Sequence, residues 1–367
     1  MKAWTWRRGG RLEPRGWDGK EGIEIPTAGE GELLVRVHAA SLNPIDWKTM
    51  DGAHDWLLRM RWPRVPCFDF SGEVVKVGGA GAGGRWKEGD RVFGMIRGLP
   101  QLGRGALAEY MVVDEDVCAA CPPSFSHVDC ASLPLVAITA LKAFRACRLQ
   151  ERSQDHPRVL VAGGAGGVGT VAIQIVRNMM GAEVVATASP GRKTTLCEEL
   201  GARVVNYHEE WVKKLEEEGC SFDVVLDCVG DAKRCARLLK EGGSLCSIVA
   251  GGTQDALLTW LDDARVDPRS ITMGVEVVLR SSWGGQLVEF FSGAAGLRSL
   301  CRRRGGSFFH VIGAGDGELM GVLAEAMGRG QVKPVIDSVF SFEDALAAFA
   351  KSREGHAGGK IVVEIRK

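Results

Sequence analysis

Hydrophobic residues follow two different patterns along this chain. In the first third, apolar and polar residues alternate over short runs such as 32–38 and 71–77, which is typical of strands with one buried face. Turns rich in glycine separate these runs, and the pattern of a long amphipathic helix is missing. Residues 1–133 are therefore predicted to form a β-rich domain.

From about residue 134 the pattern changes to short, continuously apolar runs that alternate with stretches of helical spacing, such as 209–218 and 231–240. Continuously apolar strands that alternate with helices are typical of a parallel sheet covered on both faces. A sixth strand is expected at 307–312, whereas the role of residues 253–306 stays open. The five earlier strands are predicted at Arg158–Ala162, Glu183–Thr187, Arg203–Tyr207, Phe222–Asp227 and Ser244–Val249.

The end of the chain returns to β-rich patterning. A helix is expected at 317–327, a strand at 335–340, a second helix from about Phe342, and a last strand at 360–365. The predicted fold class is thus α/β, with a β-rich domain beside a doubly wound parallel sheet.

A glycine loop follows the first parallel strand and opens a helix. Residues 163–169 contain the pattern Gly164-x-Gly166-x-x-Gly169, and Gly181 is placed to end the helix. Glycine lets the backbone approach a pyrophosphate, and the helix N-terminus offers N–H groups and a positive dipole end. A glycine-rich loop without a ligand is the alternative. The residues assigned to the dinucleotide here are Gly163, Gly164, Ala165, Gly166, Gly167, Val168 and Gly169.

The next strand indicates which dinucleotide is bound. An NAD site places an acidic residue at the end of this strand to hold the ribose diol. Here the strand ends without an acid at Ser189, and Arg192 and Lys193 follow. A hydroxyl and two cations favour a 2′-phosphate, so NADPH is the expected cofactor. The alternative is that the two cations simply begin a surface helix.

Composition excludes several classes of protein. Lys+Arg and Asp+Glu both number 46, so the chain lacks the basic excess expected of a nucleic-acid-binding protein. We expect no membrane span, because the longest uncharged stretch, 159–176, is interrupted by the glycine loop. Eleven cysteines, an odd number, are spread over a long chain, which favours reduced thiols and a cytoplasmic location.

With these residues in view, the chain resembles the medium-chain dehydrogenase/reductase superfamily, in its zinc-independent quinone oxidoreductase and enoyl reductase branch. The resemblance implies a GroES-like domain of residues 1–133 completed by 316–367, and a Rossmann domain of residues 134–315. It also implies an active site between the domains, a homodimer, and Tyr207 and Lys360 near the cofactor. Besides the glycine loop, the resemblance is carried by Ala39–Asp46, Phe70–Val74, Gly89–Phe93, Ala108–Val112, Ala131–Ala140 and Gly355–Lys360.

Zinc-dependent members of this superfamily hold a catalytic metal with cysteine, histidine and glutamate. The matching positions here are Asn43–Asp46 and Phe68-Asp69, and the four-cysteine structural lobe is missing. Cys118, Cys121, His127 and Cys130 superficially resemble a metal set, but the resemblance puts them on different elements. We therefore expect no metal. Without one, hydride transfer to an already activated alkene or quinone is the easier chemistry.

The resemblance places Asn43 and Thr139 beside the nicotinamide. Relatives often carry a tyrosine near position 48, whereas this chain has Lys48. Lys48 has two interpretations: it holds a developing enolate oxygen, or it is a surface lysine paired with Asp46. Protonation from solvent is then expected. Trp47, Trp56 and Trp62 are interpreted either as packing residues or as a hydrophobic substrate wall.

The predicted function is an NADPH-dependent reductase that transfers hydride to a quinone or to the activated C=C of an α,β-unsaturated carbonyl. Its substrate is expected to be a small hydrophobic molecule, which the sequence does not identify. One alternative is a trans-acting enoyl reductase of a biosynthetic acyl chain. Arg302–Arg304 would then be a patch that docks the acyl carrier, whereas without such a role the run is a solvated surface. A second alternative is a non-catalytic NADPH-binding protein.

Overall fold

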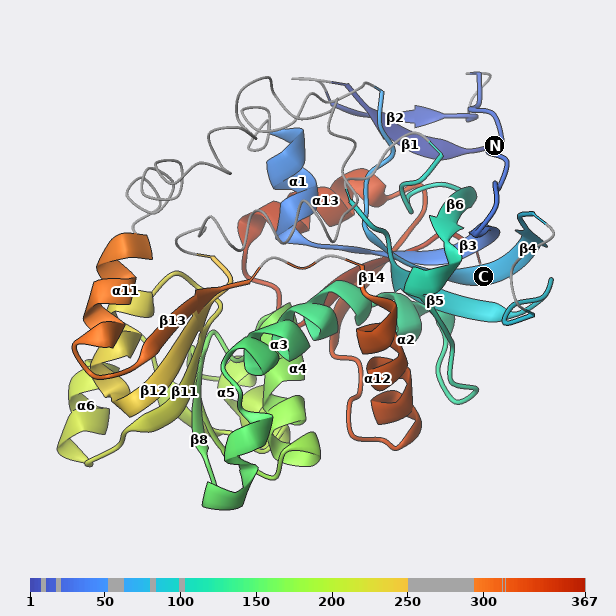
Figure 1. The fold of residues 1–367 in the computed structure, drawn as a ribbon. Coiled ribbons are helices and arrows are strands. Elements are labelled where there is room, and N and C mark those ends of the chain that lie inside the picture. Colours follow the sequence, from blue (N-terminus) through green and yellow to red (C-terminus); the bar gives the residue numbers. More distant parts are fainter. Residues whose placement is uncertain are drawn as a thin grey trace.

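Two large sheets contain most of the strands in the part of the chain that the structure describes (Figure 1). The computed structural model describes residues 1–7, 11–17, 21–51, 63–79, 84–98, 103–249, 294–311, 313 and 315–366. Most of the stretch 253–306, together with Trp56 and Trp62, lies outside these residues.

The first sheet joins strands from both ends of the chain. Its order is β14-β15-β3-β4-β5-β7, with β6 paired to the other part of β3. The C-terminal strand β15 runs antiparallel to β3, so residues near 361 lie beside residues near 42, and both chain ends lie at this domain (Figure 1). A hairpin, β1-β2, packs nearby. The bounds are β1 Ala3–Trp6, β2 Leu12–Arg15, β3 Glu32–Leu42, β4 Asp69–Val77, β5 Arg91–Met95, β6 Tyr110–Asp114, β7 Cys118–Ala120, β14 Ile336–Ser341 and β15 Lys360–Glu364.

The second sheet is parallel throughout and has the order β10-β9-β8-β11-β12-β13. The order reverses at β8, the strand that precedes the glycine loop, which is where doubly wound sheets open a ligand crevice. The predicted fold class is confirmed: a GroES-like β domain beside a Rossmann-like sheet. The strands are β8 Arg158–Ala162, β9 Glu183–Ala188, β10 Arg203–Asn206, β11 Phe222–Asp227, β12 Leu239–Ser247 and β13 Ser307–His310.

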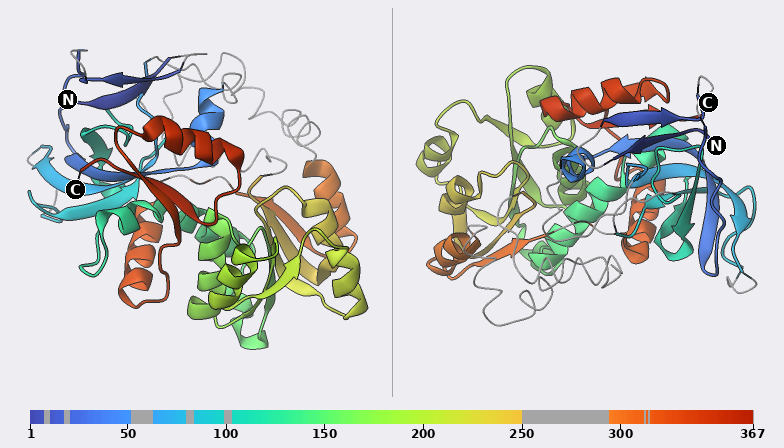
Figure 2. Two further views of the ribbon diagram at one scale, coloured as in Figure 1. Left: turned by 180° about the vertical axis from the view of Figure 1, so that it is seen from behind. Right: turned by 90° about the horizontal axis from the view of Figure 1, so that it is seen from above.

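Successive residues of the parallel strands enter different cores. Val159 and Val161 pack into a large core that continues into the β domain, whereas Leu160 and Ala162 pack on the opposite face of the sheet. Helices α3 and α4 border the first core, and α6, α7 and α11 cover the second (Figures 1 and 2). The continuously apolar strands predicted from the sequence are therefore explained by burial on both faces.

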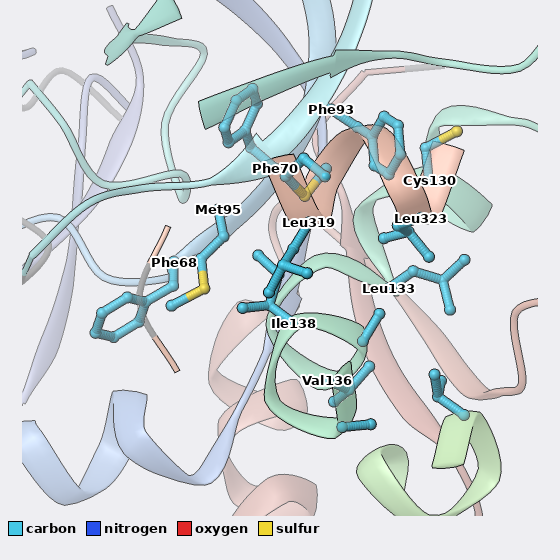
Figure 3. Packing of buried hydrophobic residues seen from close by; sticks show 14 of the residues in the cluster. Phe68, Phe70, Phe93, Met95, Cys130, Leu133, Val136, Ile138, Leu319 and Leu323 are labelled. Carbon is cyan, nitrogen blue, oxygen red and sulfur yellow. The ribbon is translucent and has the colours of Figure 1, made fainter. Parts of the chain in front are cut away.

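The shared core fixes the position of the β domain against the parallel sheet. Figure 3 shows aromatic and sulfur side chains of β4 and β5 above apolar side chains of α3 and α12. Phe70, Phe93 and Leu133 in this group are almost fully buried. Helices α3 and α12 thus hold the two sheets in one arrangement. The described helices are α1 Pro44–Met50, α2 His127–Ala131, α3 Pro134–Ala146, α4 Gly167–Gln174, α5 Arg192–Glu199, α6 Trp211–Glu217, α7 Ala232–Cys235, α11 Ala294–Arg302, α12 Gly317–Gly328 and α13 Ala345–Glu354.

The predicted helix over 231–240 is wrong in its second half. Helix α7 ends at Cys235, a single tight turn follows, and β12 already begins at Leu239. Leu239 is buried, and the ammonium of Lys240 lies 2.7 Å from the Asp223 carboxylate of the preceding strand. These tertiary contacts outweigh the local helical pattern. Within the described ranges, the helices are all too short or too polar to cross a membrane.

Candidate functional site

The glycine loop makes a turn that only glycine can form at several of its positions. Gly163 adopts a φ of +88° and donates from its backbone N–H to the Thr187 hydroxyl at 2.9 Å. A Cβ atom at Gly169 would lie 2.2 Å from the Gly163 carbonyl oxygen, and one at Gly163 would lie 2.5 Å from Val229. The strand, the turn and the start of α4 therefore stack closely, as the pattern predicts.

One side of this loop is open toward a ligand. Gly166 caps α4, and a Cβ atom there would approach only the Gly163 oxygen, at 3.5 Å. The first turn of α4 contains no acidic residue, so its backbone N–H groups meet no competing carboxylate of their own helix. These N–H groups and the positive end of the helix suit a pyrophosphate. A π-helical turn, Ile175–Met179, continues α4, and Gly181, with a φ of +63°, follows it as the expected end of the helical segment.

The residues predicted to select the cofactor gather at the end of β9. Ser189 follows this strand, Arg192 and Lys193 open α5, and Tyr207 follows β10, whose last residue pairs with Ala188. Arg192 is exposed, Lys193 is half-buried, and Tyr207 is 45% exposed. Among the residues that the structure describes, neither cation has an ion-pair partner. A free hydroxyl and two free cations are thus available at this corner.

A buried polar cluster lies where the β domain meets the glycine loop. The carboxylate of Asp69, which is not exposed at all, accepts hydrogen bonds from the Ser41 hydroxyl at 2.9 Å and the Asn43 amide at 2.8 Å. Its other oxygen accepts from the backbone N–H of Leu135, the second residue of α3. The ammonium of Lys360 donates to the Asn43 side-chain oxygen and lies 3.5 Å from Asp69.

Burial controls the electrostatics of this cluster. Desolvation raises the pKa of Asp69 and lowers the pKa of Lys360, although each charge attracts the other. Burial also raises the pKa of Asp46 to about 7, against hydrogen bonds from the backbone N–H groups of Asn43 and Cys67. The side-chain amide of Asn43 lies between the Asp69 carboxylate and the Lys360 ammonium. Its orientation is fixed: the nitrogen faces Asp69 and the oxygen faces Lys360.

The carbon chain of Lys360 and the backbone of the preceding residue, Gly359, both lie against the glycine loop. Gly359 forms an isolated parallel bridge with Gly166, and a Cβ atom at Gly167 would lie 3.0 Å from Lys360 Cδ. The ammonium turns away from the loop and donates to the Leu42 carbonyl oxygen as well as to Asn43. In this conformation the Lys360 side chain thus lies beside the loop, while its ammonium binds within the β domain; its predicted place near the cofactor stays a prediction.

The structure brings Thr139 close to this cluster and separates Lys48 from it. Thr139 is buried in α3, and its hydroxyl donates to the Leu135 carbonyl oxygen at 2.7 Å. Leu135 is also the residue whose backbone N–H donates to Asp69. Lys48 is exposed on α1, with its ammonium 5.6 Å from the centre of the Trp47 ring. The carboxylate of Asp46 points into the interior, where its two oxygens accept from backbone N–H groups, so Lys48 and Asp46 face different environments.

Sequence reasoning did not identify the contacts that Asp69, Ser41 and Asp46 make in and beside the polar cluster. It identifies Asp69 only as a position where zinc-dependent relatives have a ligand. A signal is present: Asp69 stands between two phenylalanines, and Lys360 opens an apolar strand, so each places a charge inside a buried run. Two such charges on elements of one domain indicate a buried pair.

The side chains around Asn43 do not fit a catalytic zinc. Within the described ranges, the single group of three His, Cys, Asp or Glu side chains close enough to share an ion is His38, Glu73 and His127. In the polar cluster, the Asn43 amide and the Asp69 carboxylate are already engaged by the Lys360 ammonium. Cys118 and Cys121 point to different partners, the Asp114 carbonyl oxygen and the Ser71 hydroxyl.

Comparison with known proteins decides the family. Residues 29–123 match the alcohol dehydrogenase GroES-like domain family, and residues 200–363 match the zinc-binding dehydrogenase family. The 2-methylene-furan-3-one reductase of Solanum lycopersicum is 30% identical over 99% of this chain and 79% of its own length. The chloroplastic quinone oxidoreductase QR1 of Triphysaria versicolor is 31% identical over 93% of this chain and 92% of its own.

The chain belongs to the medium-chain dehydrogenase/reductase superfamily, in its branch of quinone oxidoreductase- and alkenal reductase-like proteins. Solved structures agree. The quinone oxidoreductase of Coxiella burnetii superposes with a TM-score of 0.75 at 25% identity, covering 100% of this chain and 99% of that one. The quinone oxidoreductase of Thermus thermophilus, also solved in complex with NADPH, gives a TM-score of 0.68 at 26% identity over 100% of both chains. As a member of this branch, the chain is an NAD(P)H-dependent oxidoreductase.

Proposed function

We propose that this superfamily member is a metal-independent, NADPH-dependent reductase of quinones or of α,β-unsaturated carbonyls. The observation that carries the proposal is the junction of the two sheets. There the open start of α4 lies against β15, and Asn43 is held in a fixed orientation beside it. A dinucleotide on the loop and a substrate at Asn43 would share this junction.

The residues present fit NADPH. The N–H groups of Gly167, Val168 and Gly169 at the start of α4 would hold the pyrophosphate. Ser189, Arg192, Lys193 and Tyr207 would surround the 2′-phosphate, and the two unpaired cations support NADPH over NADH. When bound, the reduced nicotinamide supplies the hydride.

The chain's own contribution is positioning. Hydride addition to the β-carbon of an unsaturated carbonyl leaves an enolate, whose α-carbon then takes a proton; a quinone takes a hydride and a proton to become a hydroquinone. The Asn43 amide, fixed by Asp69 and Lys360, would orient the carbonyl group. Thr139, connected to the same network through Leu135, would border the nicotinamide. Lys48 is exposed, so we assign the final proton to solvent.

The trans-acting enoyl reductase alternative receives no support from the arginine run. Arg302 ends α11, and Arg304 donates to the Leu239 carbonyl oxygen at the start of β12. The run therefore lies at the amino edge of the sheet, whereas the glycine loop lies at the carboxyl edge. A carrier docked on the arginines would stand at the far edge from the cofactor.

A fluorescence titration with NADPH and NADH tests the cofactor. We expect tighter binding of NADPH, and Arg192→Ala or Lys193→Ala should weaken NADPH binding by about 10- to 100-fold, the worth of one hydrogen bond to a charged group. NADH binding should stay unchanged in both variants. Lys213→Ala, which removes an exposed lysine of α6, is the matched control. Tighter binding of NADH by the unmodified protein would overturn the NADPH assignment.

A substrate panel tests the reaction. NADPH oxidation is followed with a quinone, a 2-alkenal and an enoyl thioester. We expect turnover with the first or the second, lost in Asn43→Ala while NADPH still binds. Turnover with the thioester alone would favour the acyl-chain alternative. Tight NADPH binding without any turnover would instead identify a non-catalytic NADPH-binding protein.

The compartment and assembly complete the proposal. All eleven cysteines carry free thiols, which supports a reducing compartment such as the cytoplasm. Several relatives are named as chloroplastic or mitochondrial proteins. We propose that the substrate is a small hydrophobic molecule and that the protein acts as a homodimer, as its family suggests.

A further inference from the structure

Two histidines and a glutamate gather on the β domain, away from the glycine loop. The rings of His38 and His127 are stacked, with centres 4.3 Å apart and planes 20° apart. One ligand atom from each of His38, His127 and Glu73 lies within 4.8 Å of the other two. All three side chains are partly exposed, so the cluster lies near the surface of the β domain.

A β-bulge aims His38 into this group. In the pairing of β3 with β4, Val37 faces Gly72 and Ala39 faces Ser71, so His38 is an extra residue without a partner on β4. Bulges re-aim side chains and are enriched beside functional sites. The His38 carbonyl oxygen accepts from the N–H groups of Ile365 and Arg366, which fixes the bulge to the end of the chain.

The ring nitrogens are prepared to accept a metal. The Ser71 hydroxyl has one proton and donates it to the Val92 carbonyl oxygen at 3.1 Å. Arg91 Nε donates to His127 Nε2, so Nε2 carries the lone pair of the neutral ring, and the proton on Nδ1 is donated to the Ser71 hydroxyl, 2.8 Å away. This arrangement, in which one ring nitrogen donates to the protein and the other carries the lone pair, is typical of metal-binding histidines. Among the described residues, His38 Nε2 is buried without a hydrogen-bond partner, 3.6 Å from Glu73 Oε2.

We propose that His38, Glu73 and His127 bind a divalent transition metal such as Zn²⁺, Ni²⁺ or Co²⁺. Two imidazole nitrogens and one carboxylate oxygen are ligands that suit these ions, and water would complete the coordination. The site is separate from the proposed catalytic site. Lys360 begins β15 at the glycine loop, whereas Ile365, beside His38, lies five residues further on, about 16 Å along an extended strand.

Cationic side chains compete with the metal, Arg36 and Arg91 among them through direct contacts. The Arg36 guanidinium lies 3.3 Å from Glu73 Oε2, and Arg91 Nε donates to His127 Nε2 across a long 3.4 Å contact. Arg91 also donates to the Phe125 carbonyl oxygen, which would retain it when the metal displaces the longer contact. Because Arg36 and the metal would compete for Glu73, removal of Arg36 should strengthen metal binding. A histidine pair with a purely structural role would show no such effect.

Cobalt(II) titration of the full chain, followed by visible absorption and by competition with a chelator, tests the site. We expect one ion per chain with a spectrum of nitrogen and oxygen ligands, and binding should be lost in His38→Ala and His127→Ala. Ser71→Ala should weaken it about 10- to 100-fold, as removal of a partner that orients a ligand does. Arg36→Gln should strengthen it up to about fivefold, the worth of an exposed ion pair.

The controls separate this site from other metal binding. His156→Asn removes an exposed histidine elsewhere and should leave the affinity unchanged. Thermal unfolding without metal checks that each variant is folded, and Glu73→Gln, at a partly exposed position, serves if a histidine variant does not fold. A thiolate-to-metal absorption band would overturn the proposal in favour of cysteine ligands such as Cys121. Unchanged affinity in both histidine variants, or weaker binding in Arg36→Gln, would also overturn it.

Discussion

Removal of the Lys360 ammonium should destabilise the β domain strongly and in a pH-dependent way. Lys360 is 4% exposed and Asp69 is 0% exposed. Lys360→Met keeps most of the carbon chain that packs against Gly167 and removes only the charge. Asp69 would retain its hydrogen bonds from Ser41, Asn43 and Leu135 but would lose its cation.

The size of the effect follows from the burial of the pair. Removal of one partner from a buried ion pair costs about 3–5 kcal/mol, because the other charge is left unpaired. Asp69 can reduce this cost by keeping a proton, since burial already raises its pKa. The native state of the variant would then hold a proton that the unfolded chain has lost above pH ~4. Stability therefore falls as pH rises, and the loss should be larger at pH 8 than at pH 5.5.

Urea denaturation followed by circular dichroism at these two pH values measures the effect. Lys351→Met is the matched control: Lys351 pairs with Asp337 at 2.6 Å but is 37% exposed, so about 1 kcal/mol or less is expected. The double variant Lys360→Met/Asp69→Asn should recover part of the stability. A loss in Lys360→Met no larger than in the control, or one independent of pH, would refute the buried-pair reasoning. A selective rise in the KM for NADPH would support the predicted place of Lys360 near the cofactor.

Three further predictions concern single positions. Burial lowers the pKa of His310 to about 4, so between pH 6.5 and 4 the unfolded chain binds a proton that the native state does not bind. The free energy of unfolding should therefore fall by about 3 kcal/mol over this range. In His310→Gln, the urea midpoint should depend less on pH. Gly169→Ala places a Cβ atom 2.2 Å from the Gly163 oxygen, so NADPH binding by fluorescence should be lost; retained affinity would contradict the loop geometry. Gly321→Ala, inside α12 with open space around it, should raise stability by about 0.5–1 kcal/mol in the same urea assay, and any loss would contradict that packing.

The glycine loop could be predicted because everything it needs lies in consecutive residues. The strand before it, the turn and the helix after it are all local, so Gly163 and Gly169 could be assigned before the fold was known. The same reason explains the success with the parallel strands, whose continuously apolar runs follow from burial on both faces. Local patterns were misleading where Leu239 and Lys240 join β12, because contacts with a neighbouring strand decide that segment.

The contacts within the polar clusters could not be derived from local patterns, although the two buried charges leave a signal in the sequence. Asp69 and Lys360 are 291 residues apart, and their contact exists only because β15 pairs with β3. The orientation of Lys360 toward Asn43, instead of toward the loop, depends on that pairing. The bulge at His38 has no local signal, since it is a property of the register between β3 and β4.

The insertion of β15 between β14 and β3 has a consequence for synthesis of the chain. Strand β3 is synthesised before the central sheet, yet the sheet of the β domain stays incomplete until β15 follows, since Leu42 and Lys360 are 318 residues apart. Residues 158–247, which form five of the six parallel strands, are complete well before that point. We therefore expect the central sheet to fold first, while β3 keeps an unpaired edge. A nascent chain stalled before Lys360 would present that edge to chaperones, and release of the final strand would close it.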